Sequence, residues 1–156
     1  YRSLVLWLTA PHGNITNGEY LEWESQGEEG HAHCRGFNYS NGNLVVPVNG
    51  LYRVFLQITY ESKTEYHCSV NELRLTNKVY KIWDGYNVDV PLLISVDTVS
   101  CSTTQWSKSL YTEGLFSLNA NTRLRVSSSC PELIVKKECQ MFFGAELRYL
   151  ESTSHQ

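Results

Sequence analysis

One long strand constrains the fold of this chain more than any other feature of its sequence. Residues 50–60 read Gly-Leu-Tyr-Arg-Val-Phe-Leu-Gln-Ile-Thr-Tyr, with apolar side chains at every second position over 52–58. This alternation is typical of a strand with one face in a core. The opposite face carries Leu51 and Phe55, which predicts a contact with a second protein surface. Two scattered surface residues are the alternative, since these are common. Gly50 ahead of the strand indicates a turn.

The rest of the chain shows the same preference for strands. No window keeps an apolar stripe at period 3.6 over three turns, so we expect no long helix. Nine or ten strands in one domain predict an all-β sandwich or jelly roll. We expect a single domain over 1–150 and a flexible tail over 151–156. The predicted strands cover residues 3–8, 20–23, 44–48, 51–60, 70–83, 88–99, 109–118, 123–127 and 141–150.

Composition excludes several classes of partner. The 156-residue chain has a net charge of -3 and no basic run, which argues against nucleic-acid binding. It contains no apolar run near the roughly 18 residues of a membrane helix. Aromatic residues make up 12% of the chain, which favours strands and interfaces over helices.

The cysteines and two sequons favour an extracellular protein. None of the five cysteines forms a C-x-x-C pair, which excludes zinc-ribbon and thioredoxin-like sites. Asn14-Ile15-Thr16 and Asn38-Tyr39-Ser40 are acceptor sequences for N-glycans, so Asn14 and Asn38 are candidate glycosylation sites. Disulfides and glycans belong to oxidising compartments. An odd cysteine count leaves one thiol free or bonded between chains.

No catalytic or metal site is predicted. His31 and His33 alternate beside Cys34, but zinc needs three or four converging ligands and only these two histidines share a face. The chain has no Gly-x-Ser-x-Gly elbow and no carboxylate pair spaced for acid–base chemistry. We therefore expect no enzyme, metal, cofactor or small-molecule substrate.

Five segments resemble the tumour necrosis factor ligand superfamily in sequence, order and spacing. The glycine-tyrosine strand at 50–58 and Met-Phe-Phe-Gly-Ala at 141–145 resemble two of its signature strands. The segments at 4–10, 21–24 and 110–118 also match. Residues 38–41 followed by 44–47 look most like its vascular endothelial growth inhibitor branch.

The resemblance implies a ten-strand jelly roll that assembles as a homotrimer. Such a trimer is an extracellular cytokine that clusters receptors with cysteine-rich domains. It is either the ectodomain of a type II membrane protein or its shed form. The positions that match the aromatic residues of the trimer axis are Phe55, Tyr111 and Phe142. Arg53, Gln57 and Glu146 are expected in the same interface.

Receptors of this family bind in the grooves between protomers, through loops of two neighbours. The tyrosine that commonly anchors the receptor matches Tyr86, with Asp84 beside it. A tyrosine on a loop tip offers rigid area and a hydroxyl at low entropic cost. A tyrosine that packs on its own loop is the alternative. His12, Asn14 and Glu132 complete the predicted receptor-binding residues.

Two disulfides are expected. The branch resemblance implies Cys68–Cys101, which joins two loops at one end of the sandwich. Cys130–Cys139 is predicted as a second bridge, because the eight residues between them can turn back within one loop. Cys34 is then the odd thiol.

The C-terminal strand departs from the family pattern by its charges. Alternation places Phe142, Gly144, Glu146 and Arg148 toward the trimer axis, and Phe143, Ala145, Leu147 and Tyr149 in the core. Lone charges near an axis are costly to desolvate. We therefore predict that Arg53 and Glu146 form an ion pair, within or between protomers. The alternative is an open axis end that leaves these charges in water.

Two other functions share this fold. One is the trimeric head of the complement first-component type, a pattern-recognition module. A collagen stalk of Gly-x-y repeats would identify it, and the sequence has none. The other is a carbohydrate-binding jelly roll, which a glycan array would detect.

Overall fold

A computed structural model describes residues 4–11, 13–17, 19–25, 33–40, 42–66, 68, 71–82, 88–101 and 105–152. At residues 17, 33–35 and 40 it describes only the backbone.

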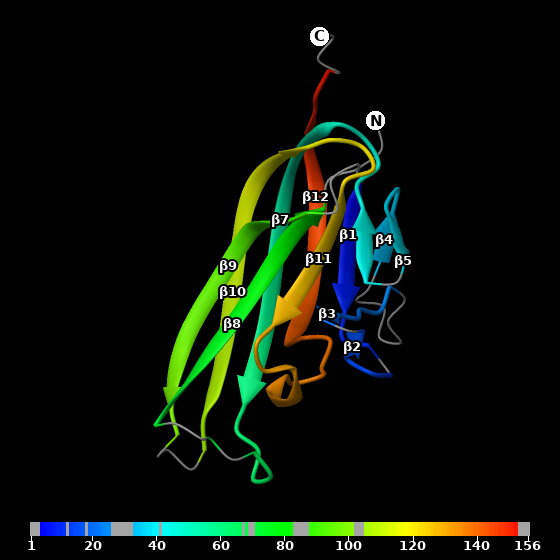
Figure 1. The fold of residues 1–156 in the computed structure, drawn as a ribbon. Coiled ribbons are helices and arrows are strands. Elements are labelled where there is room, and N and C mark those ends of the chain that lie inside the picture. Colours follow the sequence, from blue (N-terminus) through cyan, green and yellow to red (C-terminus); the bar gives the residue numbers. More distant parts are fainter. Residues whose placement is uncertain are drawn as a thin grey trace.

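Two antiparallel five-stranded sheets pack face to face (Figure 1). The first sheet has the strand order β10 (Ser107–Leu118), β7 (Gly50–Glu61), β12 (Met141–Leu150), β1 (Val5–Thr9) and β4 (His33–Arg35). The second has the order β5 (Asn38–Ser40), β6 (Asn43–Val45), β11 (Arg123–Ser128), β8 (Glu72–Ile82) and β9 (Asp89–Ser100). A hairpin of β2 (Thr16–Asn17) and β3 (Tyr20–Leu21) and a short 3-10 helix, η1 (Pro131–Leu133), complete the described elements.

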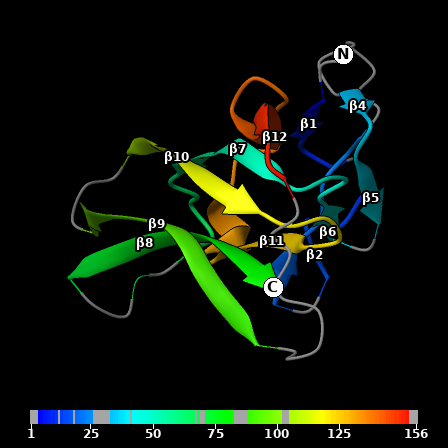
Figure 2. The ribbon, with the colours of Figure 1, turned by 90° about the horizontal axis from the view of Figure 1, so that it is seen from above.

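The architecture confirms the predicted jelly-roll sandwich of about ten strands. Figure 2, viewed from above, shows the two sheets as separate layers. The three-residue strands β4 and β5 were not predicted from the sequence.

The core lies between the sheets and follows the predicted alternation of β7. Tyr52, Val54, Leu56 and Ile58 are fully buried. The second sheet contributes buried side chains at alternate positions of β8 and β11, namely Leu75, Val79, Leu124 and Val126. Burying these side chains is the main stabilising contribution to the fold.

Gly50 has a different role from the predicted turn. It is the first residue of β7, and its φ angle does not lie in the left-handed region. A Cβ at this position would lie 2.5 Å from Leu147 Cδ1 and 2.6 Å from the Tyr149 carbonyl oxygen. Glycine is therefore required because the end of β12 approaches it closely.

The prediction that Tyr149 lies in the core is wrong. Phe143 and Ala145 are fully buried as expected, but the register of β12 against β7 shifts between Leu147 and Tyr149. Such a bulge moves the following side chains to the other face. Tyr149 consequently lies opposite Leu51 and is 68% exposed.

One of the two predicted disulfides is present. Cys68–Cys101 joins the segment before β8 to the end of β9, across a separation of 33 residues. The Cys130–Cys139 bridge is wrong, because Cys130 is a buried free thiol and Cys139 an exposed one.

The backbone between Cys130 and Cys139 explains the missing bridge. After η1 it runs along the end of β7, where Val135 N donates to the Thr59 carbonyl and Ile134 bridges Tyr60. This docking replaces the expected fold-back. The side chain of Cys34 lies outside the described residues.

We expect Gly144→Ala to lower the free energy of unfolding by about 1 to 3 kcal/mol, the usual cost of overpacking. The added Cβ would overlap the Leu6 carbonyl oxygen and lie 2.5 Å from Phe55 Cζ. Urea denaturation at one fixed protein concentration measures the change. Gly13→Ala is the matched control, because nothing lies within 4 Å of its Cβ position. Equal stability of the two variants would contradict this packing.

Candidate functional site

The outer face of the first sheet gathers every residue predicted for the trimer axis. Strand register places Tyr111, Gln57 and Phe142 in one row across β10, β7 and β12. A second row holds Glu113, Phe55, Gly144 and Trp7. A third row holds Leu115, Arg53, Glu146 and Val5. We call this surface the outer face.

An aromatic cluster occupies the centre of the outer face. Trp7 stacks on Phe142 with ring centroids 4.7 Å apart and lies 5.0 Å from the Phe55 ring. Phe55 is only 1% exposed within the single chain. Trp7 and Phe142 flank its ring within the chain, and the contact of Phe55 with a neighbouring copy stays a prediction. Sequence reasoning missed Trp7, although alternation along β1 places it on this face.

The predicted pair between Arg53 and Glu146 is confirmed, and it forms within one chain. Arg53 Nε lies 2.7 Å from Glu146 Oε1, and its Nη1 lies 2.9 Å from Glu113 Oε2. Arg148 Nη2 reaches the same oxygen of Glu146 at 3.0 Å. The Tyr111 hydroxyl donates to Glu113 Oε2 at 3.0 Å. We call these five residues the charge network; sequence reasoning found only its central pair.

The charge network balances its own charges. Burial alone would lower the pKa of Arg53, but its hydrogen bonds to Glu146 and Glu113 outweigh this and raise it. The hydrogen bond from Arg53, followed by that from Tyr111, lowers the pKa of Glu113. A lowered carboxyl pKa gives stability above the unfolded-state pKa that is lost as pH falls through the folded value. Two guanidinium groups and two carboxylates leave the charge network itself without net charge.

Exposed large hydrophobic side chains lie within and around the charge network. Tyr111 is 47% exposed and Leu115 59% exposed, both on β10. The bulge in β12 brings Tyr149 opposite Leu51, on the same side of the sheet. Large apolar side chains that gather on one face indicate an interaction surface.

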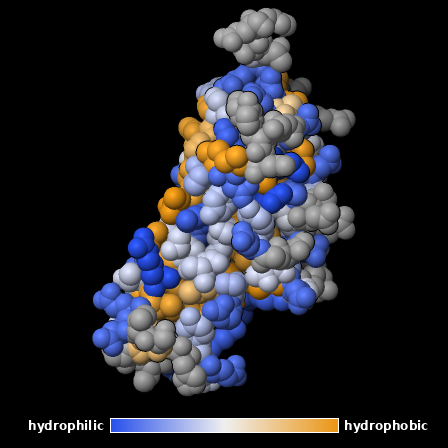
Figure 3. All heavy atoms as spheres, viewed as in Figure 1, coloured by the Kyte–Doolittle hydropathy of each residue, from blue (hydrophilic) through white to orange (hydrophobic). Residues whose placement is uncertain are grey.

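A second apolar surface follows the outward side of β9. Leu93 and Val99 point into the core, whereas Val90, Ile94 and Val96 are exposed, as is Val88 just before the strand. Figure 3 shows orange atoms along the upper left margin, the side on which β9 runs in Figure 1. In the described part of the chain, β9 is the last strand of its sheet. We call these four residues the β9 stripe.

The predicted loop residues are described only in part. Tyr86, Asp84 and His12 lie outside the described residues. Asn14 is exposed between β1 and β2, and Glu132 is exposed on η1.

A hydrogen bond joins the two loops that are described. Lys136 Nζ donates to the Gly13 carbonyl at 2.6 Å, so the segment after η1 lies against the segment that carries Asn14. Asn38 is exposed on β5, as a glycan acceptor must be.

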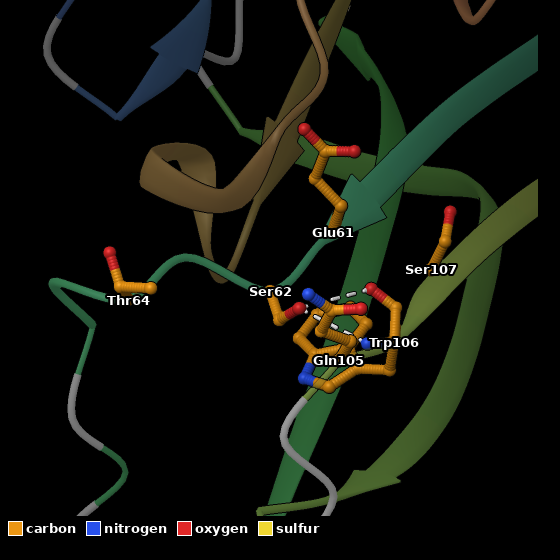
Figure 4. A pocket seen from close by; sticks show the side chains of 6 residues that line it. All are labelled: Glu61, Ser62, Thr64, Gln105, Trp106 and Ser107. Atoms are coloured by element: carbon orange, nitrogen blue, oxygen red, sulfur yellow. Dashed lines mark hydrogen bonds between the residues drawn. The ribbon is translucent and has the colours of Figure 1, made fainter.

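A hollow of about 720 Å³ opens where β7 ends and β10 begins (Figure 4). Ser62 Oγ accepts a hydrogen bond from Trp106 N at 3.1 Å and donates to the Trp106 carbonyl at 3.4 Å. Figure 4 shows Glu61 and Thr64 directed away from this pair. Among the described residues that line the hollow, Glu61 is the sole acid, so these residues form no acid–base pair.

The described residues contain neither a cluster of metal ligands nor a membrane-spanning helix. Among them, no three His, Cys, Asp or Glu side chains come together as metal ligands. No helix among the described residues is long and apolar enough to cross a membrane.

Known proteins similar to this chain form one group. The model of the TNF (Tumour Necrosis Factor) family matches residues 21–147. Lymphotoxin-alpha of Notamacropus eugenii is 32% identical over 85% of the chain and 66% of its own length. Tumor necrosis factor ligand superfamily member 15 of Mus musculus is 33% identical over 72% of the chain and 48% of its own length. Member 6 of Mus musculus is 33% identical over 80% of the chain and 42% of its own length.

These matches agree with the resemblance seen in the sequence. Member 15 represents the vascular endothelial growth inhibitor branch, which is thus among the relatives. The identities to the three proteins are nearly equal, so they single out no branch. The chain spans between about two fifths and two thirds of the length of these relatives.

We expect Glu146→Gln to destabilise the fold by about 1 to 3 kcal/mol, since Arg53 and Arg148 both lose their shared carboxylate. Replacing the pair together, Arg53→Leu with Glu146→Leu, is expected to match or exceed the parent. Urea denaturation of the parent, Arg53→Leu, Glu146→Leu and the double variant forms a double-mutant cycle.

A half-exposed ion pair provides the control for this cycle. Asp97→Asn removes the contact of Lys108 and Asp97, 3.5 Å apart, and we expect it to cost less than about 1 kcal/mol. Additive effects of the Arg53 and Glu146 substitutions would show that the two side chains do not interact.

Proposed function

This chain belongs to the tumour necrosis factor family, and from that premise we propose that it is the receptor-binding part of a trimeric extracellular cytokine. Three copies bind and cluster cell-surface receptors of the tumour necrosis factor receptor superfamily, whose cysteine-rich domains meet the trimer. The observation that carries this proposal is the family match over 21–147, the stretch that forms most of both sheets. The same match favours a cytokine over a complement-type head or a carbohydrate-binding jelly roll.

The outer face supports the trimer. Leu115 and Tyr149 remain exposed around a charge network that is already neutral, and Tyr111 is exposed within it. Contact with another copy buries these apolar side chains without an unpaired charge. A three-fold ring needs two different surfaces on each copy, since head-to-tail contacts are heterologous. We expect an interface above the roughly 2,000 Å² at which obligate assemblies begin.

Receptor binding involves loops that come from three parts of the sequence. Tyr86 is the proposed anchor, with Asp84 beside it. The segment with His12 and Asn14 and the segment with Glu132 carry the other proposed receptor contacts. The Lys136–Gly13 hydrogen bond supports the pairing of these two segments. The β9 stripe begins two residues after Tyr86 and extends the same surface with apolar area.

Disulfide chemistry and exposed sequons support an extracellular location. Cys68–Cys101 is a bond of oxidising compartments. Asn14 and Asn38 are both exposed, and we propose that both carry N-glycans. A glycan on Asn14 would crowd the first receptor loop and restrict which receptors dock. By analogy with its family, we propose that the chain is the ectodomain of a type II membrane protein or its shed form.

We expect Phe142→Asp to dissociate the trimer, because it introduces a charge without a partner at the interface. Light scattering at micromolar concentration measures the assembly. Phe142 also flanks Phe55, so Leu115→Asp is the sharper variant: Leu115 is 59% exposed in the single chain, where a charge is tolerated. A monomeric parent protein would disprove the trimer.

We expect Tyr86→Ala to weaken receptor binding by about 1 to 2 kcal/mol, the effect of removing an aromatic anchor. Surface plasmon resonance against soluble receptor ectodomains measures the affinity, after light scattering has shown an intact trimer. Glu72→Ala, at the far end of β8 from this loop, serves as the control. Equal affinities of Tyr86→Ala and the parent would remove Tyr86 from the binding site.

A further inference from the structure

Tyr20 joins the β2–β3 hairpin to the outward side of the second sheet. Its hydroxyl donates a hydrogen bond to Asp89 Oδ2, on the first residue of β9. The guanidinium carbon of Arg125 lies 4.6 Å from the centre of the Tyr20 ring. Tyr80 meets the same ring edge-on, with centroids 6.3 Å apart. One side chain of the hairpin therefore contacts β11, β8 and β9.

The surface that receives Tyr20 is held in place by the sheet. Arg125 and Tyr80 are directly paired across β11 and β8. Arg125 Nε donates to Asn43 Oδ1 at 2.5 Å, which ties its guanidinium group to β6. Paired positions on neighbouring strands fix the direction of both side chains. A cation over a tyrosine ring adds an attraction that does not depend on the hydroxyl.

The segment that leads into the hairpin has a second attachment. Lys136 Nζ donates to the Gly13 carbonyl, four residues before β2 ends. The segment from Gly13 to Leu21 is thus bonded to the loop after η1 and to the start of β9. In the sequence, β9 begins three residues after Tyr86. These two hydrogen bonds therefore connect three segments that are remote in sequence: the segment with the hairpin, the loop after η1 and the start of β9.

We propose that Tyr20 is a positioning residue for receptor binding, which holds the Gly13–Asn17 segment and the start of β9 in one fixed relation. The inference rests on the proposed function, and it specifies how two of the receptor segments are kept together. A surface fixed before binding loses less conformational entropy when the receptor docks. Leu21, which is 1% exposed, anchors the hairpin in the core, so the hairpin stays folded without the Tyr20 hydroxyl.

The test compares two tyrosines of the same cluster. Tyr20→Phe keeps the ring and its contact with Arg125 but removes the hydrogen bond to Asp89. Tyr80→Phe is the matched control, because the Tyr80 hydroxyl has no hydrogen-bond partner among the described residues. Asp89→Ala and the double variant Tyr20→Phe with Asp89→Ala complete a cycle. All are made in the trimeric protein.

Two measurements are made on each variant. Hydrogen–deuterium exchange reports the protection of amides over 13–17 and 88–92. Dissociation rates are measured for soluble ectodomains from a panel of tumour necrosis factor receptor superfamily members. We expect Tyr20→Phe to raise both exchange over 88–92 and receptor dissociation by about threefold to tenfold. Asp89→Ala should raise exchange and receptor dissociation by the same factor. The double variant should then show no further change in either quantity.

The outcomes separate the inference from the proposed function. A parent trimer that binds no ectodomain of the panel contradicts the proposed function itself. A parent that binds, with Tyr20→Phe and Tyr80→Phe dissociating alike, overturns the positioning role. Faster exchange without faster dissociation also overturns it, since it shows a purely structural bond. Independent effects of Tyr20→Phe and Asp89→Ala show that the two residues do not act together.

Discussion

The packing of Phe55 over Gly144 is the contact on which the first sheet depends. Because Gly144 has no side chain, Cζ and Cε2 of the Phe55 ring can lie close to β12 at this position. Trp7 and Phe142 then pack beside that ring, and the Arg53 guanidinium lies 4.4 Å above it. In this position Arg53 reaches the two carboxylates of the charge network. The packing of this sheet, its aromatic cluster and its charge network thus all depend on the absence of a side chain at residue 144.

The charged residues that are predicted to lie near a trimer axis are already paired within one chain. A carboxylate that lacks a partner in its own chain must find one in a neighbouring copy. The stability of the assembly then depends on a residue of that neighbour. Here Arg53 is already bonded to Glu146 and Glu113 in the same chain. In the proposed trimer, the added desolvation would therefore be limited to a neutral cluster, and apolar contacts would supply the driving force. The charge network contributes more to the specificity of the contact between copies than to its strength.

Sequence reasoning succeeded where a local pattern carried the information. Alternation placed the core residues of β7, and complementary charges on one face placed Arg53 beside Glu146. It failed where long-range backbone contacts decide. The strands β4 and β5 have three residues each, too few for a pattern. The bulge that exposes Tyr149 comes from pairing with β7, and the docking of Val135 on β7 keeps Cys130 from Cys139. Tyr20 bonds a residue 69 positions away, which no local signal reveals.

The last strand of the second sheet has a consequence for how the protein must be produced. β9 is twelve residues long, and in the described part of the chain it pairs on one side only. An exposed apolar edge of this length is a template for pairing with other chains and hence for aggregation. Two features interrupt it: Pro91 has no N–H to offer, and the ladder with β8 is irregular between Val79 and Tyr80. Pairing of such edges between newly folded copies leads to precipitation, so yield should depend on folding conditions more than on thermal stability.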